Sequence, residues 1–106
     1  MPKSNILYSP EAIRDLDEIW SYISDELQNP DSATDTVGGI MDMVDNLNRF
    51  PQMGPPLSPV IHIECTFRFL ICGNYIAFYH IDGDIVYVDR VLYGKRDYIR
   101  ILFEKE

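Results

Sequence analysis

Long hydrophobic runs, cysteines and positive charges are all scarce in this sequence of 106 residues. The longest apolar runs fall well short of the roughly 20 residues that a membrane-spanning helix requires. The first residues also lack the basic and hydrophobic regions of a secretory signal peptide. These absences predict a soluble cytoplasmic protein with no membrane partner, and the length suits one domain over residues 1–106.

Cysteine and histidine are too sparse to indicate a metal site. The two cysteines, Cys65 and Cys72, have no further Cys or close His to complete a ligand set. The two histidines, His62 and His80, stand apart from each other and from any acid spaced for catalysis. We therefore interpret the cysteines as buried thiols and the histidines as structural residues, and we expect no metal and no cofactor.

Positive charge is scarce overall but concentrated near the C-terminus. Nine basic residues oppose 17 acidic ones, and the formal net charge of −8 weakens any general affinity for nucleic acid. The exception is the stretch from 90 to 100, where four cations accompany the single acid Asp97. These cations are Arg90, Lys95, Arg96 and Arg100. Their placement predicts a local site for an anionic partner.

A long amphipathic helix is predicted near the N-terminus. Ser9 can cap free backbone N–H groups, Pro10 is tolerated at the first helical position, and Glu11 suits the positive end of the helix dipole. Apolar residues then recur at spacings of three and four, namely Ala12, Ile13, Leu16, Ile19, Trp20, Ile23 and Leu27. We expect this stripe, Trp20 included, to face the core, and the opposite polar side, Asp15 included, to face solvent.

A second helix should follow and form an antiparallel αα-hairpin with the first. Asn29 and Pro30 end the first helix and start the next. Its apolar stripe consists of Ala33, Val37, Ile40, Met41, Val44 and Leu47, with Phe50 at its limit. Gly38 and Gly39 should each lower the stability of this helix by roughly 1 kcal/mol, so we expect either a close contact there or a local kink. The proline-rich stretch 51–59 then forms a loop within the domain.

The remaining sequence is typical of β-strands. Segments 67–72, 75–81 and 85–92 are dense in β-branched and aromatic residues, and Gly73-Asn74 and Asp82-Gly83-Asp84 join them as hairpin turns. We also expect a strand at 4–8, a strand or extended loop at 60–65, and a short helix at 96–103. The prediction is an α+β fold, in which the N-terminal strand and helical hairpin pack on a small antiparallel sheet that precedes a short C-terminal helix.

Three segments carry a resemblance to a known family. They are YSPEAIRDLDEIWSYI near the N-terminus, FPQMGPP after the second helix, and RFLICGNYIAFYHIDGDIVYVDRVLYGKRD in the sheet. Together with the order of elements they resemble the RelE/ParE family of toxins from bacterial type II toxin–antitoxin modules, over nearly the whole chain. The resemblance implies a small cytoplasmic toxin that an antitoxin neutralises. It also implies one of two activities, ribosome-dependent mRNA cleavage in RelE-like members or inhibition of DNA gyrase in ParE-like members.

Residues near the C-terminus bear on the choice between these activities. RelE-like members supply Lys, Arg and a Tyr for RNA cleavage. Arg96 matches one cation of that pattern, and Arg68 and Tyr98 would complete the set if the chain were a metal-independent endoribonuclease. Ile76 stands where such ribonucleases often have an arginine, and Leu102 where they have the tyrosine. The resemblance is therefore closer to ParE-like members, and the acidity of the chain also favours a protein target over ribosomal RNA.

We therefore expect a toxin that forms a hetero-oligomer with its cognate antitoxin, inhibits DNA gyrase and is not an enzyme. Two alternatives stay open, a RelE-like ribosome-dependent mRNA endonuclease and a non-toxic, degenerate family member that only binds an antitoxin. The residues expected to contact the antitoxin or target, in a groove beside the sheet, are Arg68, Arg90, Tyr93, Lys95, Arg96 and Arg100. Arg90 also has a structural interpretation, an ion pair with Asp89, Asp97 or an acid of the first helix.

Overall fold

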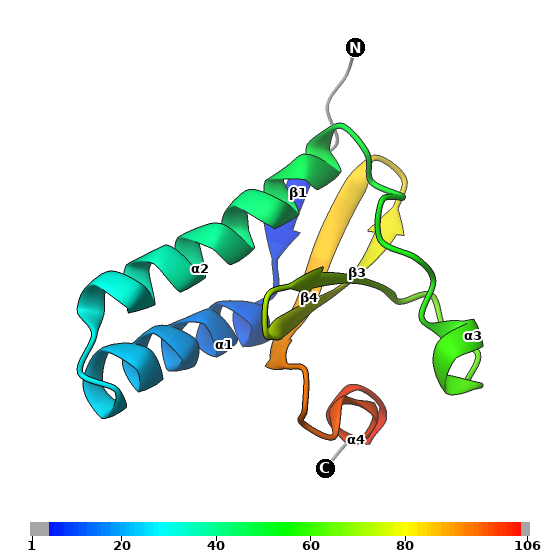
Figure 1. Ribbon diagram of the computed structural model, residues 1–106. Coiled ribbons are helices and arrows are strands. Elements are labelled where there is room, and N and C mark those ends of the chain that lie inside the picture. The colour runs from blue at the N-terminus through cyan, green and yellow to red at the C-terminus, as the bar shows by residue number, and fades with distance from the viewer. Residues whose placement is uncertain (1–4, 105–106) are drawn as a thin grey trace.

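A four-stranded sheet lies between a helical hairpin and a smaller second layer (Figure 1). The computed structural model describes residues 5–104. The elements follow in the order β1 (Asn5–Tyr8), α1 (Pro10–Ser21), η1 (Tyr22–Glu26), α2 (Pro30–Asp45), η2 (Asn46–Asn48), α3 (Ser58–Ile61), β2 (Arg68–Cys72), β3 (Tyr75–Asp82), β4 (Ile85–Tyr93) and α4 (Tyr98–Phe103). This order confirms the predicted α+β class, and Ser4 of the expected first strand lies outside the described residues.

The sheet is mixed, although we expected it to be antiparallel. Its strand order is β1-β4-β3-β2, and β2, β3 and β4 form the antiparallel meander that the turn residues predicted. Gly73 and Gly83 each have a φ of 63°, which allows these tight turns. The first strand instead pairs in parallel with β4. Parallel pairing needs a long crossover connection, and the helical hairpin after β1 begins such a connection.

A β-bulge in β4 sets the direction of its side chains. Phe78 pairs with Arg90, but its neighbour Tyr79 pairs with Val88, so Asp89 is an extra residue on β4. Because of this extra residue, Val88 and Val91 both point into the core under the helices although they are three positions apart. The bulge thus changes which residues of β4 face the hairpin.

The first helix starts as the sequence predicted and ends in a π-helical turn. The Ser9 Oγ accepts a hydrogen bond from the Ala12 backbone N–H at 2.9 Å and donates one to the Asp89 carbonyl at 2.8 Å. This cap therefore also ties the helix to the bulge of β4. The helix continues from α1 into the π-helix η1, and Gln28 follows with a φ of 53°.

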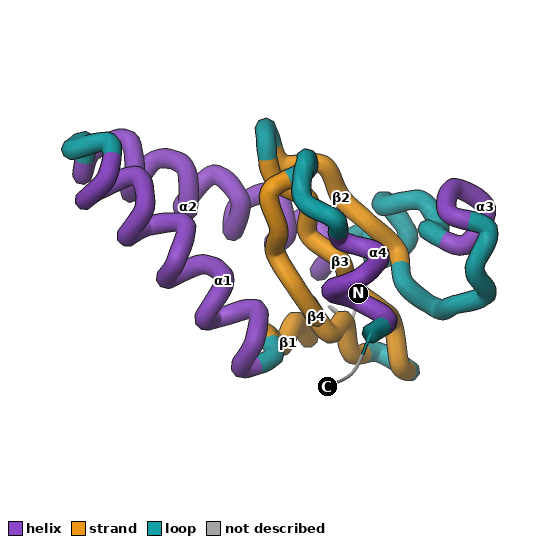
Figure 2. The backbone as a smooth tube through the Cα atoms, turned by 90° about the horizontal axis from the view of Figure 1, so that it is seen from below, coloured by secondary structure: helices purple, strands orange, loops and turns teal. Residues whose placement is uncertain are grey.

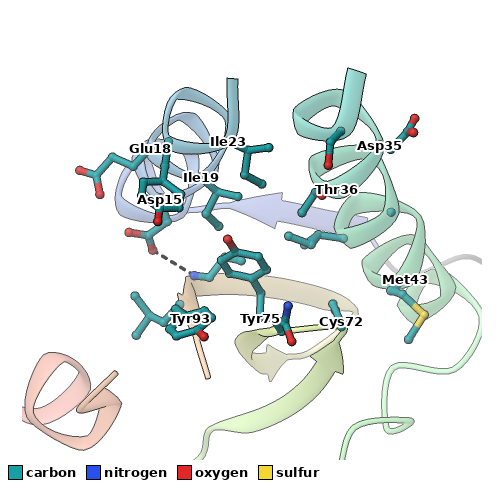
Figure 3. A pocket seen from close by; sticks show the side chains of 18 of the residues that line it. Asp15, Glu18, Ile19, Ile23, Asp35, Thr36, Met43, Cys72, Tyr75 and Tyr93 are labelled. Carbon is teal, nitrogen blue, oxygen red and sulfur yellow. Dashed lines mark hydrogen bonds between the residues drawn. The ribbon is translucent and has the colours of Figure 1, made fainter. Parts of the chain in front are cut away.

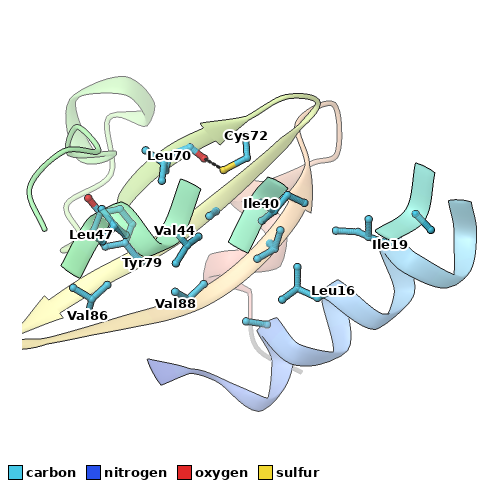
Figure 4. Packing of buried hydrophobic residues seen from close by; sticks show 14 of the residues in the cluster. Leu16, Ile19, Ile40, Val44, Leu47, Leu70, Cys72, Tyr79, Val86 and Val88 are labelled. Carbon is cyan, nitrogen blue, oxygen red and sulfur yellow. Dashed lines mark hydrogen bonds between the residues drawn. The ribbon is translucent and has the colours of Figure 1, made fainter. Parts of the chain in front are cut away.

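The main core lies between the hairpin and one face of the sheet (Figure 4). Its fully enclosed members include Ala12, Ala33, Val44, Leu47, Ala77, Tyr79, Val86 and Val88. Several predicted stripe residues are exposed instead, namely Ile13, Trp20, Leu27, Met41 and Phe50. Trp20 is 39% exposed, and its Nε1–H donates to the Thr34 Oγ1 at 3.4 Å, across the outside of the hairpin. The stripe is thus wider than the buried face of the first helix, which consists of Ala12, Asp15, Leu16, Ile19 and Ile23.

A second layer covers the opposite face of the sheet (Figure 2). Leu57, Phe78 and Leu92 are its buried centre, and Tyr98 of α4 packs on Phe78 with ring centroids 5.1 Å apart. The helix α4 confirms the short C-terminal helix, and the Asp97 side chain caps it. The strand considered for 60–65 is wrong, because residues 58–61 form the helical turn α3 and residues 62–67 have no regular structure.

The glycine pair of α2 makes none of the close contacts that we considered. Ideal Cβ atoms on Gly38 and Gly39 would meet nothing within 4 Å, and α2 continues through both residues. The close approach occurs at Gly54 in the proline-rich loop. Its N–H donates to the Tyr79 hydroxyl at 2.9 Å, and its carbonyl accepts from the Arg68 Nε at 2.7 Å. Among residues 5–104 no helix is long and apolar enough to cross a membrane.

The two cysteines differ in burial, which gives a first prediction. Cys72 is buried, as expected, whereas Cys65 is only partly buried. Burial raises the pKa of the Cys72 thiol to about 11. At pH 8 about one molecule in a thousand then carries the reactive Cys72 thiolate.

We expect Ellman's reagent at pH 8 to react rapidly with one thiol of the folded protein and with both after denaturation. Cys65→Ser should abolish the rapid reaction, and the matched Cys72→Ser variant should retain it. Equal rates for the two thiols in the folded protein would contradict the burial of Cys72.

Candidate interaction groove

An open groove of about 1000 Å³ lies between the helical hairpin and the end of the sheet formed by the β2–β3 turn (Figure 3). The floor is apolar and includes Ile19, Ile23, Ile40, Cys72 and Val91. It is open because the end of the hairpin near its turn extends beyond the strands, so the inner side of that end has no sheet opposite it (Figure 1). A volume of this size exceeds what side chains fill within a core and suits a segment of another molecule.

Three tyrosines stand at one side of the groove. Tyr22 belongs to the π-helical turn, whereas Tyr75 and Tyr93 face each other from β3 and β4 with ring centroids 5.8 Å apart, edge to face. Burial, and then the proximity of Tyr22 and Tyr93, raises the pKa of Tyr75, so this phenol stays protonated at neutral pH. Aromatic side chains of this kind are typical anchors of protein interfaces.

The charged groups of the groove are mainly acidic. Glu18 of α1 and Asp35 of α2 place exposed carboxylates on its two helical walls. Arg96, in the segment between β4 and α4, is the basic residue of its lining. Arg96 forms no ion pair with any other residue in the described range 5–104. A ligand in this groove therefore meets a carboxylate on each wall and a cation at one end.

A buried ion pair lies beside the groove and joins the hairpin to the sheet. Asp15 is only 5% exposed, and its Oδ2 and Oδ1 accept from the Arg90 Nε at 2.7 Å and Nη2 at 2.8 Å. The Asp15 Oδ2 also accepts from the Val91 backbone N–H at 3.0 Å. The hydrogen bonds that Arg90 donates to Asp15 raise the pKa of Arg90. Of the partners considered for Arg90, the acid of the first helix is the observed one.

The predicted cationic residues do not all gather into one patch, although Arg96 and Arg100 line the same small pocket beside α4. Arg90 is bonded to Asp15, and the Arg100 Nε pairs with the Glu104 Oε2 at 3.0 Å on exposed α4. Arg68 binds the proline-rich loop through Gly54 and faces the hairpin side of the sheet. Lys95 is exposed, and Arg96 and Tyr93 line the groove. Of the residues expected in the groove, Tyr93 and Arg96 line it, whereas Arg90 and Arg100 pair with carboxylates of the chain itself. Which of the six contact an antitoxin or target stays a prediction.

The residues of the ribonuclease alternative are likewise dispersed. Arg68 pairs with Tyr79, whose side chain lies in the core under the hairpin. Tyr98 packs on Phe78, which belongs to the opposite face of the sheet. Because successive residues of a strand face opposite sides, Arg68 and Tyr98 are separated by the sheet itself. Tyr98 is close to Arg96 in the chain, and its N–H donates to the Arg96 carbonyl, but its ring packs on Phe78, so the three residues do not form one cluster.

Sequence reasoning missed several residues that the fold brings together. Asp15 was expected on the solvated side of its helix, although its spacings of three from Ala12 and four from Ile19 in the buried stripe could have indicated otherwise. His80 was expected to lack an acid partner, but its Nδ1 lies 2.7 Å from the Asp89 Oδ2. The two residues lie on neighbouring strands, a contact that no spacing in the sequence predicts. Burial raises the pKa of Asp89, and the hydrogen bond with His80 opposes that shift.

The sequence profile described as "ParE toxin of type II toxin-antitoxin system, parDE" matches residues 6–98. The chain belongs to this ParE toxin family. Residues 6–98 contain the hairpin, the sheet and Arg96, so the whole groove falls within the family match. The ParE-family membership makes the chain a toxin component of a type II toxin–antitoxin system.

Solved structures of two toxin–antitoxin systems share the fold of this ParE-family chain. The chromosomal ParDE system from P. aeruginosa matches with a TM-score of 0.75 and 19% sequence identity, over 90% of this chain and 100% of that one. The RelBE2 toxin–antitoxin complex from Mycobacterium tuberculosis matches with a TM-score of 0.52 and 20% identity, over 86% and 98% of the two chains. No curated protein matches the sequence. No group of three or more Cys, His, Asp or Glu within residues 5–104 is arranged to hold a metal ion.

Proposed function

We infer that this ParE-family toxin is neutralised by an antitoxin segment that docks in the groove between the hairpin and the sheet. The observation that carries this inference is the open groove itself, in which a floor of buried apolar side chains lies beside three tyrosines. Exposed side chains such as Ile71, at 61%, and Met43, at 37%, extend this apolar surface onto the rim. Contiguous exposed apolar surface with aromatic anchors is typical of a protein-binding site.

A pair of methionines on α2 allows a matched test of this docking site. Met43 lines the groove, whereas Met41, two residues away on the same helix and 43% exposed, does not. We expect Met43→Asp to weaken binding of the antitoxin, taken as the product of the small reading frame next to this gene, at least about tenfold, because it puts a charge into an apolar contact.

The control Met41→Asp should change the affinity less than about twofold, since surface substitutions outside a contact have small effects. Isothermal titration calorimetry on both variants and the unchanged protein gives the comparison. Equal effects of the two substitutions would place the antitoxin elsewhere on the toxin.

For the toxic activity, inhibition of DNA gyrase is the function that the site supports best. The dispersal of Arg68, Tyr98 and Arg96 supports a protein target over catalysis of RNA cleavage. The net charge of −8 adds support, because entry among ribosomal phosphates is unfavourable for so acidic a protein. On this proposal the toxin binds gyrase and catalyses no reaction of its own.

Induction of the toxin without antitoxin should cause filamentation and a DNA-damage response. Purified toxin should inhibit supercoiling by gyrase in vitro and leave mRNA on translating ribosomes intact. Cleavage of ribosome-bound mRNA that Arg96→Ala abolishes would overturn the gyrase proposal and assign Arg96 to the stabilisation of transition-state charge. A normal growth rate, with antitoxin binding retained, would identify a non-toxic binding module.

A further inference from the structure

The acidity of the chain is concentrated in the two helices that form the walls of the groove. Between residues 10 and 45 there are ten acidic residues and one basic residue, Arg14. The rest of the chain has seven acids and eight bases, so it is nearly neutral. Any segment that enters the groove therefore approaches through the negative field of the hairpin.

Glu18 and Asp35 bring this negative charge to the groove itself. Both carboxylates are exposed and line opposite helical walls, and neither forms an ion pair with any other residue from 5 to 104. Asp15 also lines the groove, but Arg90 and the Val91 N–H already satisfy it. The groove thus has two carboxylates to offer a ligand, one on each side of an apolar floor.

The single basic group of the lining gives the groove a polarity along its length. Arg96 follows β4, at the end of the groove that the sheet contributes, whereas Asp35 lies in the first half of α2. A bound segment with an acidic group near Arg96 and basic groups near the helices would complement all three charges. A segment with acidic flanks would face like charge on both walls.

We propose that the groove selects a positively charged amphipathic segment of the antitoxin. Its apolar side lies on the floor, Lys or Arg residues on its two flanks face Glu18 and Asp35, and a carboxylate near one end faces Arg96. This inference rests on the proposed docking of an antitoxin in the groove and specifies the chemistry of the segment. It reverses the expectation from the sequence, in which clustered cations bind an acidic segment.

The test compares two double charge reversals on the same helices. Glu18→Lys/Asp35→Lys changes the two groove carboxylates, and Asp17→Lys/Asp42→Lys makes the same change of charge at exposed positions outside the groove. Each variant is mixed with the product of the adjacent small reading frame, and stopped-flow fluorescence measures the association rate constant at 50 mM and 500 mM NaCl. Circular dichroism of each variant establishes that it is folded.

We expect the groove variant to associate at least about tenfold more slowly than the unchanged toxin at low salt, since electrostatic steering raises association rates by about 10- to 1000-fold. The control should slow association less than about threefold, and the difference should shrink at high salt, where exposed charges are screened. Replacing the flanking Lys or Arg of the antitoxin by Glu should then restore fast association with the groove variant alone.

Other results separate the failure of this proposal from that of the docking site. Equal rates for the two toxin variants, or faster binding by the groove variant, would overturn the charge complementarity while Met43→Asp still weakens the complex. If Met43→Asp had no effect on binding, the antitoxin would not dock in the groove, and both proposals would be wrong.

Discussion

Replacing Gly54 by alanine should destabilise the fold by about 3 kcal/mol or more. A Cβ atom at this position would overlap the backbone carbonyl oxygen of Phe69 and lie 2.8 Å from the Tyr79 hydroxyl. Tyr79 is fully buried, so it cannot move aside, and the Phe69 carbonyl belongs to the backbone of β2. The loop must therefore leave its position on the sheet.

Displacement of the loop would also break the hydrogen bonds that hold it. The Tyr79 hydroxyl accepts from the Gly54 N–H and donates to the Pro51 carbonyl at 2.8 Å, while Arg68 binds the Gly54 carbonyl. A buried phenol left without partners adds about 1–3 kcal/mol to the loss. Two of the network's acceptors are backbone carbonyls, so no single side-chain substitution elsewhere can restore it.

Urea denaturation gives the measurement, and Gly38→Ala is the matched control. Gly38 lies within α2 with nothing within 4 Å of its added Cβ, so alanine there should stabilise the protein by up to about 1 kcal/mol. Alanine is thus expected to destabilise the protein at Gly54 and to stabilise it at Gly38. A shared midpoint for the Gly54→Ala and unchanged proteins would contradict the close approach at Gly54.

Asp15→Ala should reduce stability by about 3–5 kcal/mol, the usual effect of breaking a buried ion pair from one side. The substitution leaves the Arg90 guanidinium without its bidentate partner and the Val91 N–H without an acceptor. Arg90→Ala should be about as harmful, since it leaves a carboxylate that is 5% exposed unpaired by charge. Both losses act on the contact between α1 and β4.

A double-mutant cycle isolates the pair. The variant Asp15→Ala/Arg90→Ala should be less destabilised than the sum of the single variants, with a coupling energy of about 1–3 kcal/mol. Asp17→Ala, an exposed acid two residues away, serves as the control and should change the free energy of unfolding by less than about 0.5 kcal/mol. Additive single effects would mean that the ion pair contributes nothing beyond each residue's own packing.

Local patterns predicted most of the secondary structure correctly. The stripe at spacings of three and four identified both helices, and Ser9 and Asn29 cap them as expected. The three strands of the meander were predicted within a residue or so of their observed ends. These features depend on interactions between residues close in the chain, such as capping, turn geometry and side-chain periodicity, so a sequence pattern records them directly.

The groove and its charge could not be predicted in the same way. Arg90 and Asp15 are 75 positions apart, and a bulge at Asp89 decides which residues of β4 reach the first helix. Trp20 fits the apolar stripe but is 39% exposed and contacts Thr34 of α2 in place of the sheet. Only the register of the strands and the overhang of the helices determine these outcomes.

The sequence by itself determined the class of fold, the two helices, the antiparallel meander and the likeness to the RelE/ParE family, because each rests on local pattern or composition. The tertiary structure alone decided that β1 joins the sheet in parallel, that Asp15 and Glu104 pair with two of the clustered cations, and that Glu18 and Asp35 face an open groove. The sequence does not reveal the charge of the groove because a charge acts on groups that are near in space, which can be far apart in the chain. Folding placed acids from the hairpin beside the groove and left Arg96 as its one basic lining residue.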